Sequence, residues 1–274
     1  MKLCRYLHLA CLFALGQLLS VAAPAGPELG LQTWTCRNMT FDQVVAFASE
    51  HGVKKIQFIG AQLDPMAPAV ESLRKKAVLK EHGLTAYSFG VNKGGLDKEA
   101  NRKLFEFARL MDMKVIMVEP PDLAAWDNLE ELVKEYDIKL AIHNHGRGTP
   151  YGDPATVKAV LAKRDRRIGV CLDVGWITAA GFDAAVIFSE YGDRVYDIHF
   201  KDKQIIMTDG KPVPVDTEIG KGAANYAGLF AAIKKSGWSG VMAIETDSKA
   251  FAENPNRLVS EARVFFDAQM AAGK

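Results

Sequence analysis

The sequence predicts a (β/α)8 barrel, a closed ring of eight parallel strands surrounded by helices. Strand-like and helix-like segments alternate eight times along the chain, at a spacing of roughly 25 to 35 residues. This alternation implies parallel strands joined by right-handed helical crossovers. The length agrees, because the chain has 274 residues and about 250 are usual for this fold. A doubly wound open sheet fits less well, because no GxGxxG loop follows the first strand.

Each unit is recognised from a short apolar run followed by apolar residues at helical spacing. Thr40 stands before the first helix as an N-cap, and Gly52 and Gly83 end the first two helical patterns. The predicted strands cover residues 29–35, 55–60, 84–91, 114–119, 139–143, 168–173, 195–200 and 240–245. The predicted helices cover residues 41–51, 69–82, 98–111, 123–136, 154–162, 182–191, 226–236 and 256–270. After the seventh strand, Asp209-Gly210 predicts the turn of a small β-ribbon that forms a lid.

The amino-acid composition limits the classes of protein to which this chain can belong. The chain is 49% hydrophobic and 24% charged, which is ordinary for a soluble protein with one substantial core. It carries 34 Lys+Arg against 33 Asp+Glu, so its net charge is near zero. A nucleic-acid-binding protein would show a basic excess or stripe, and we therefore expect no nucleic-acid partner.

The first 25 residues have the pattern of a secretory signal peptide. Lys2 and Arg5 precede an almost wholly apolar run at 7–21, and alanines suited to cleavage follow it. The apolar run is short and interrupted for a transmembrane anchor, which needs about 20 residues. We therefore predict a signal peptide at 1–25, a single barrel domain at 26–274, and a periplasmic or secreted protein without a membrane span after signal removal.

Ionisable residues stand at the carboxyl ends of five consecutive predicted strands. They are Glu119, then His143 and His145, then Asp173, His199 and Glu245. Active sites of this fold form at these ends. Singly, each residue has an ordinary explanation, such as a helix cap, a solvated loop residue or a hydrogen-bonded core histidine. Together, however, they would bury several ionisable groups at one mouth, which is costly unless a cation or ion pairing compensates. The pattern therefore predicts a metal site.

The motifs LAIHNHG, CLDVGW, DIHFKD and AIETD at these strand ends resemble the xylose isomerase-like TIM-barrel superfamily, often called sugar phosphate isomerases/epimerases. The resemblance covers nearly the whole mature chain. It implies one divalent ion, Mn²⁺, Mg²⁺, Co²⁺ or Zn²⁺, with Asp173, His199 and Glu245 as ligands. The fourth ligand of the family is commonly a glutamate at the end of strand four or five. Glu119 is the available glutamate, while His143 stands where many relatives carry theirs, so either Glu119 completes the shell or the shell contains two histidines.

The same resemblance suggests how a substrate is held. Relatives often carry a histidine where this chain has Trp176, so an imidazole contact is replaced by a stacking surface. Trp176 and Trp34 are candidate walls against a sugar ring, although ordinary packing explains them about equally well. Arg147 begins a polar loop that could close on a sugar. Lys201 is expected to bind substrate hydroxyls or a developing oxyanion, with Asp202 positioning it.

A metal that chelates a carbonyl and a neighbouring hydroxyl favours removal of the intervening C–H proton and stabilises an enediolate. The candidate bases are His145, His143 and a carboxylate, either Glu245 or Glu119.

Three functions remain open. The first is an exported metal-dependent isomerase or epimerase of a free sugar or keto-sugar. The second is a lyase or dehydratase that acts on keto-glycosides or inososes by β-elimination. The third is a barrel that binds carbohydrate without turnover. In each, the partner is a small-molecule carbohydrate, and the sequence does not define an oligomeric state.

Overall fold

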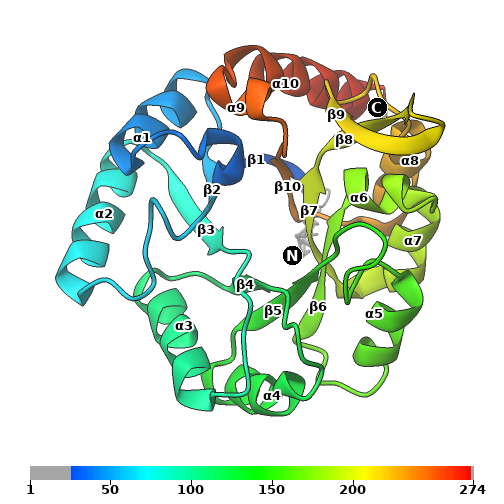
Figure 1. The fold of residues 1–274 in the computed structure, drawn as a ribbon. Coiled ribbons are helices and arrows are strands. Elements are labelled where there is room, and N and C mark those ends of the chain that lie inside the picture. Colours follow the sequence, from blue (N-terminus) through cyan, green and yellow to red (C-terminus); the bar gives the residue numbers. More distant parts are fainter. Residues whose placement is uncertain (1–25, 273–274) are drawn as a thin grey trace, which may run out of the picture.

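Eight parallel strands form a nearly closed barrel inside a ring of helices, as the sequence predicts (Figure 1). The computed structural model describes residues 26–272, so the predicted signal peptide at 1–25 lies outside the described residues. The barrel strands are β1 (Glu28–Gln32), β2 (Lys55–Phe58), β3 (Thr85–Phe89), β4 (Val115–Val118), β5 (Lys139–His143), β6 (Ile168–Asp173), β7 (Val195–Phe200) and β10 (Val241–Ile244). Within residues 26–272, no helix is long and apolar enough to cross a membrane.

The hydrogen-bonded order of the strands is β3-β2-β1-β10-β7-β6-β5-β4. The two outer strands of this order, β3 and β4, meet through an isolated bridge between Asn92 and Val118. There the Asn92 N–H donates to the Met117 carbonyl at 2.9 Å, and the Glu119 N–H donates to the Asn92 carbonyl at 2.8 Å. The junction therefore closes the ring directly beside Glu119.

All eight predicted helices are present, and their ends differ from the prediction by at most two residues. They are α1 (Phe41–Glu50), α2 (Ala69–Glu81), α3 (Lys98–Leu110), α4 (Ala125–Tyr136), α5 (Pro154–Leu161), α7 (Ala184–Tyr191), α8 (Tyr226–Ser236) and α10 (Asn256–Ala271). Four short helices were not predicted: η1 (Thr33–Cys36), α6 (Val174–Ala179), η2 (Gly192–Arg194) and α9 (Lys249–Glu253). Helix α6 starts directly at the end of β6 because the Asp173 carboxylate accepts the backbone N–H of Trp176 at 2.8 Å.

Alternation along the strands separates the apolar core from the polar site. Outward residues such as Leu140, Leu172 and Ile198 pack in the large core between sheet and helices. On the same strands, Ala141 and Cys171 belong to a small inner apolar layer. Because side chains two residues apart share a face of a strand, the residues that follow this layer point to the carboxyl-end mouth of the barrel.

The predicted ribbon is also present, as the antiparallel pair β8 (Asp202–Thr208) and β9 (Lys211–Thr217). The Asp216 carboxylate on β9 accepts the Thr246 hydroxyl at 2.7 Å and the Asp247 N–H at 2.6 Å. It also pairs with the ammonium of Lys203 opposite it on β8. These contacts fasten the ribbon to the segment that follows β10.

Candidate active site

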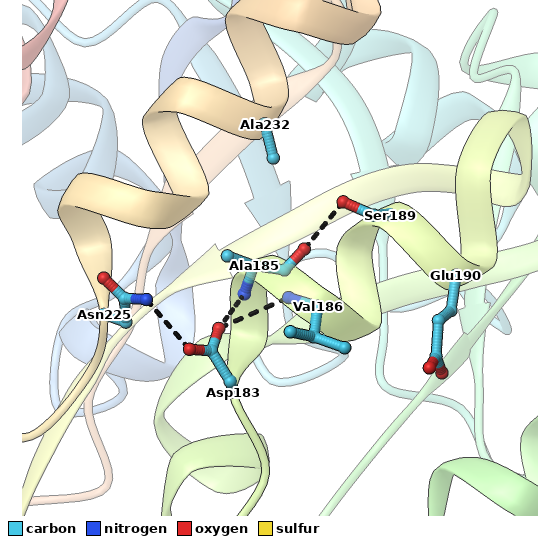
Figure 2. Close-up of a pocket in the computed structure, with 7 residues that line it drawn as sticks. All are labelled: Asp183, Ala185, Val186, Ser189, Glu190, Asn225 and Ala232. Atoms are coloured by element: carbon cyan, nitrogen blue, oxygen red, sulfur yellow. Dashed lines mark hydrogen bonds between the residues drawn. The ribbon is translucent and has the colours of Figure 1, made fainter.

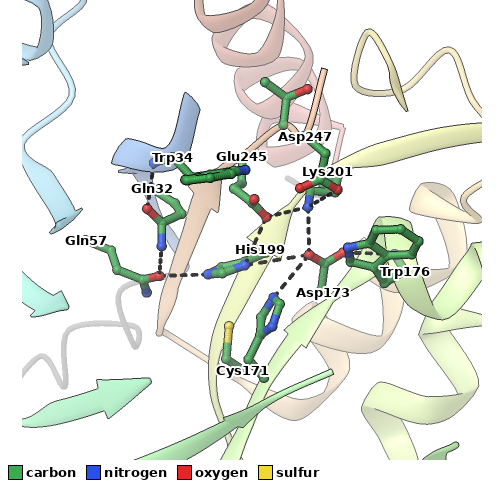
Figure 3. Close-up of polar contacts among 12 residues, drawn as sticks. Gln32, Trp34, Gln57, Cys171, Asp173, Trp176, His199, Lys201, Glu245 and Asp247 are labelled. Atoms are coloured by element: carbon green, nitrogen blue, oxygen red, sulfur yellow. Dashed lines mark hydrogen bonds and ion pairs between the residues drawn. The ribbon is translucent and has the colours of Figure 1, made fainter. Parts of the chain in front are cut away.

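Four buried side chains from neighbouring strands converge at the mouth of the barrel. His143 ends β5, Asp173 ends β6, His199 lies in β7, and Glu245 follows β10. Each offers one ligand atom, and these four atoms all lie within 4.8 Å of one another. We call these four residues the metal-capable cluster; Figure 3 shows His199, Asp173 and Glu245 pointing toward one another.

The carboxylate of Asp173 is the centre of this cluster. Its Oδ2 lies 3.3 Å from His143 Nε2 and 3.6 Å from His199 Nδ1, while His199 Nδ1 lies 3.2 Å from Glu245 Oε2. Burial raises the pKa of Asp173, but Lys201 and the two imidazoles outweigh burial and hold this pKa well below its ordinary value. Burial lowers the pKa of His143 and outweighs the opposing hydrogen bond to Asp173.

Lys201 is buried among carboxylates. Its Nζ lies 3.2 Å from Asp173 Oδ2, 2.6 Å from Glu245 Oε2 and 3.0 Å from Asp247 Oδ2. Burial lowers the pKa of Lys201, but these carboxylates outweigh it and raise the pKa well above its ordinary value. An ammonium has three N–H donors, and three carboxylates surround this one. Lys201 therefore neutralises the cluster, which differs from the expected contact with substrate hydroxyls.

Asp202 does not position Lys201, contrary to the expectation from the sequence. Its carboxylate accepts backbone N–H groups of Gly220 at 3.0 Å, Gly222 at 2.9 Å and Ala224 at 3.2 Å. A buried carboxylate is stabilised by several such donors. Asp202 therefore fixes the loop that leads from the ribbon into α8.

Glu119 lies in a second group, with His145 and His143. Its Oε2 is 2.7 Å from His145 Nδ1, a charge-assisted hydrogen bond. The structure thus brings three of the four predicted metal ligands together and places His143 beside them, while Glu119 contacts His145. The result is a carboxylate–imidazole pair next to the metal-capable cluster.

The pKa of His145 reports the interaction between its imidazole and the Glu119 carboxylate. Burial lowers the pKa of His145, but the hydrogen bond and charge of Glu119 outweigh it, so the net shift is above the ordinary value of 6.5. We expect Glu119→Gln to lower the pKa of His145, because the variant removes the negative charge that stabilises the imidazolium. An NMR titration of the metal-free wild type and variant measures the change. An unchanged or higher pKa in the variant would contradict the pairing.

A cavity of about 410 Å³ opens above these groups, a size typical of small-molecule sites. Its lining residues are Gln32, Trp34, Ile59, Gly60, Ala61, Gly90, Val91, Asn92, His143, His145, His199, Glu245 and Asp247. Of the predicted substrate contacts, Trp34 lines this cavity. Trp176 packs under the Lys203 ammonium, 3.9 Å from its ring centre, and Arg147 lies over the Phe182 ring at 5.5 Å.

A more open hollow of about 500 Å³ lies between α7 and α8, as Figure 2 shows. There Asp183 accepts the Ala185 N–H at 2.7 Å and the Asn225 side-chain amide at 2.8 Å. These contacts cap α7 and join it to α8. The hollow is larger, but its polar groups serve the helices, so we place the chemistry at the barrel mouth.

The cluster fits a divalent metal. Three of its buried atoms, His143 Nδ1, His199 Nδ1 and Glu245 Oε2, make no hydrogen bond of acceptable geometry within the described residues, although Glu245 Oε2 lies close to Lys201. Buried polar atoms are rarely left without a partner. Two imidazoles and two carboxylates are also ligands that zinc, cobalt and manganese accept. The donor set therefore suits a divalent cation without selecting one ion.

Sequence reasoning did not identify Gln57 or Gln32, which lie behind the cluster. The Gln57 amide oxygen is 2.8 Å from His199 Nε2, and Gln32 Nε2 donates to the same oxygen at 2.6 Å (Figure 3). Their signal was present in the strand pattern, because each is a polar residue in the buried, carboxyl-end part of its strand.

A parallel barrel with converging ionisable side chains and a cavity at its carboxyl-end mouth has the architecture of a barrel enzyme. The family profile described as "Xylose isomerase-like TIM barrel" matches residues 45–269. The chain therefore belongs to this family, as its strand-end motifs predicted.

Known relatives agree with this assignment. An inosose dehydratase from Lacticaseibacillus casei is 25% identical over 156 residues, which cover 53% of this chain and 52% of the relative. The chain thus spans about half the length of the curated relatives it matches.

Solved structures share the fold. The IolI protein with a bound zinc atom has a TM-score of 0.68 and 15% identity, with coverage of 90% of this chain and 99% of that one. A sugar phosphate isomerase/epimerase from Parabacteroides distasonis has a TM-score of 0.65 and 16% identity, covering 89% and 97%. The names of these relatives include a dehydratase and an isomerase/epimerase, in agreement with the prediction of an enzyme.

Proposed function

We propose that this protein is a divalent-metal-dependent enzyme that removes a proton next to the carbonyl of an unphosphorylated sugar or keto-polyol, through an enediolate. The observation that carries this proposal is the Glu119–His145 pair, 2.7 Å apart, beside a metal-capable cluster and at a cavity of small-molecule size. A base next to a Lewis-acid site is the arrangement that proton abstraction at such a carbon requires.

Within this proposal, His143, Asp173, His199 and Glu245 hold the metal, so that His143 takes the ligand position first considered for Glu119. A divalent ion held there would polarise the substrate carbonyl and stabilise the charge that develops on its oxygen. Lys201 compensates the negative charge of the Asp173 and Glu245 carboxylates, because its ammonium lies 3.2 Å and 2.6 Å from their oxygens.

His145 is the proposed base. Its Nδ1 faces Glu119 Oε2 at 2.7 Å, so Nδ1 carries the hydrogen and Nε2 has the free lone pair. Nε2 takes the proton from the substrate carbon, and the C–H electron pair enters the enediolate. Glu119 then stabilises the positive imidazolium and keeps the ring oriented, as a carboxylate does in other carboxylate–histidine pairs.

Elimination is the outcome that we favour after this step. The other titratable groups lining the cavity belong to the metal-capable cluster or, in the case of Asp247, pair with Lys201 and Lys203. Among the described lining residues, His145 is thus the titratable group that neither belongs to the metal-capable cluster nor pairs with a lysine. Inversion at a carbon usually needs acid–base groups on both faces, whereas elimination uses one base. The similarity to inosose dehydratase over half of each chain also supports elimination.

In this elimination the proton taken by His145 passes to the oxygen on the carbon β to the carbonyl. The C–O bond breaks, a C=C bond forms, and water or an alcohol leaves. Isomerisation by the same base is the second candidate, because it differs only in returning the proton to the neighbouring carbon.

The substrate is proposed to lack a phosphate. Among the described residues, those lining the cavity include no lysine or arginine, which are the usual partners of phosphate groups. The predicted signal peptide supports the same conclusion, since an exported enzyme would meet glycosides and free sugars. Periplasmic or secreted localisation is part of this proposal.

The experiment is incubation of the metal-loaded protein with 3-keto-glucosides, inososes and free ketoses in D₂O, followed by mass spectrometry and NMR of the products. Loss of water or aglycone is expected. Deuterium at the α-carbon without such loss supports isomerisation instead. Failure of the purified protein to bind any of Mn²⁺, Mg²⁺, Co²⁺ or Zn²⁺ would contradict both outcomes and leave the carbohydrate-binding barrel.

A further inference from the structure

Gln57 on β2 is completely buried, and its side chain reaches His199 from the side opposite Asp173. The Gln57 Oε1 atom lies 2.8 Å from His199 Nε2, while His199 Nδ1 faces Asp173 and Glu245 (Figure 3). The two ring nitrogens therefore have different partners. The direction of the Gln57 amide decides which nitrogen carries a hydrogen toward it.

Backbone groups determine that direction, because their donor and acceptor roles are invariable. The Trp34 N–H donates to Gln32 Oε1 at 2.8 Å, which orients the Gln32 amide. Its Nε2 then donates to the Gly90 carbonyl at 3.0 Å and to Gln57 Oε1 at 2.6 Å. Gln57 consequently presents an acceptor to His199, and the His199 Nε2 must carry the hydrogen.

The far side of the Gln57 amide gives the same orientation independently. Its Nε2 donates to Asp197 Oδ2 at 3.1 Å and to the Tyr87 hydroxyl at 3.3 Å. The Tyr87 hydroxyl in turn donates to Asp197 Oδ1 at 2.9 Å. A reversed amide would place the Gln57 oxygen against the Asp197 carboxylate, which has no hydrogen to donate when ionised.

We propose that Gln57 is a positioning residue that holds His199 with hydrogen on Nε2 and thereby presents Nδ1 to the metal-capable cluster as the metal ligand. The second hydrogen bond of a ligating histidine commonly sets its tautomer and ring orientation, and its loss typically reduces metal affinity by about 10-fold to 100-fold. This inference rests on the metal site of the proposed function, but the hydrogen-bond direction can be measured without metal or activity.

The test uses Gln57→Met, which keeps the length and removes the amide, and Gln57→Glu, which keeps an acceptor. A glutamate at 57 keeps an oxygen at the place where Gln57 Oε1 now accepts from His199 Nε2. Gln62→Leu is the matched control, because Gln62 is also buried but its Nε2 donates to the Cys36 and Met39 carbonyls.

Zinc affinity of the full chain is measured by chelator competition, and ¹⁵N-labelled histidine NMR of the metal-free protein observes the His199 Nε2–H. We expect Gln57→Met to weaken zinc binding about 10-fold to 100-fold and to expose the Nε2–H to rapid exchange. Gln57→Glu should restore most of the affinity, and Gln62→Leu should leave it unchanged.

Equal zinc affinity in wild type and Gln57→Met overturns the inference, as does a metal-free His199 with hydrogen on Nδ1 alone. If the wild type binds no zinc or other divalent ion, the proposed function fails. In that case the NMR signal alone tests whether Gln57 orients His199. A His199 Nε2–H that is protected in the wild type but not in Gln57→Met supports this role. An unprotected Nε2–H in the wild type overturns it.

Discussion

Asp173→Asn is expected to abolish activity and to weaken divalent-metal binding by at least about 100-fold. The substitution removes the charge that faces His143 at 3.3 Å, His199 at 3.6 Å and Lys201 at 3.2 Å. It retains a side-chain oxygen that accepts the Trp176 N–H and caps α6. The substitution therefore changes the charge of the metal-capable cluster and preserves the cap of α6. Isothermal titration with Zn²⁺ or Mn²⁺, together with the elimination assay, measures it.

Asp183→Asn is the matched control for this prediction. Asp183 also caps a helix, accepting the Ala185 N–H at 2.7 Å, but it lies in the hollow between α7 and α8. We expect wild-type metal affinity and activity in this variant. Thermal unfolding of both metal-free variants shows whether lost binding reflects lost folding. Wild-type affinity in a folded Asp173→Asn protein would mean that the cluster is not the metal site.

His145→Gln is expected to lower kcat by about 10²-fold to 10⁴-fold, the usual contribution of a general base. Metal affinity should stay within a few-fold of wild type, because His145 pairs with Glu119 and lies outside the four-residue cluster. Glu119→Gln should have a smaller effect on kcat, since the imidazole remains and only its carboxylate partner is lost. Steady-state kinetics with the substrate identified in the D₂O experiment, and zinc titrations, separate the two properties.

His51→Gln provides the comparison for His145. His51 ends α1 and its Nε2 lies 3.1 Å from Asn256 Oδ1 on the outer surface, so its replacement should not alter kcat. If His145→Gln lowered zinc affinity as much as Asp173→Asn does, His145 would belong to the metal shell. Unchanged kcat in His145→Gln would exclude it as the base and leave a carboxylate such as Glu245.

The barrel was predictable because its signals are local and repeated. Eight apolar runs separated by helical patterns define the strands, and strand alternation places His143, Asp173 and His199 at one edge. Short elements were missed where one side chain creates them. Helix α6 depends on Asp173 accepting the Trp176 N–H, a contact that apolar periodicity does not reveal.

The partners within the site were less predictable, because they depend on which strands become neighbours in the folded ring. Glu119 follows β4 and His143 ends β5, level with each other in the ladder. Of these two strands, only β5 also pairs with β6, the strand that ends in Asp173. The structure places His143 there and turns Glu119 to His145. Lys201 was predicted to face substrate, but three carboxylates from separate segments surround its ammonium, and their convergence is a property of the folded barrel.

The junction between β3 and β4 links the elasticity of the barrel to its chemistry. A single bridge at Asn92 joins these strands, whereas ladders of three or four residue pairs join the other neighbours in the ring. Local opening concentrates where few hydrogen bonds resist it. The Glu119 N–H donates to the Asn92 carbonyl at this junction, and Asn92 also lines the cavity. Opening at this bridge would therefore break the hydrogen bond that holds the Glu119 backbone against Asn92, so the orientation of the carboxylate that pairs with His145 depends on one bridge.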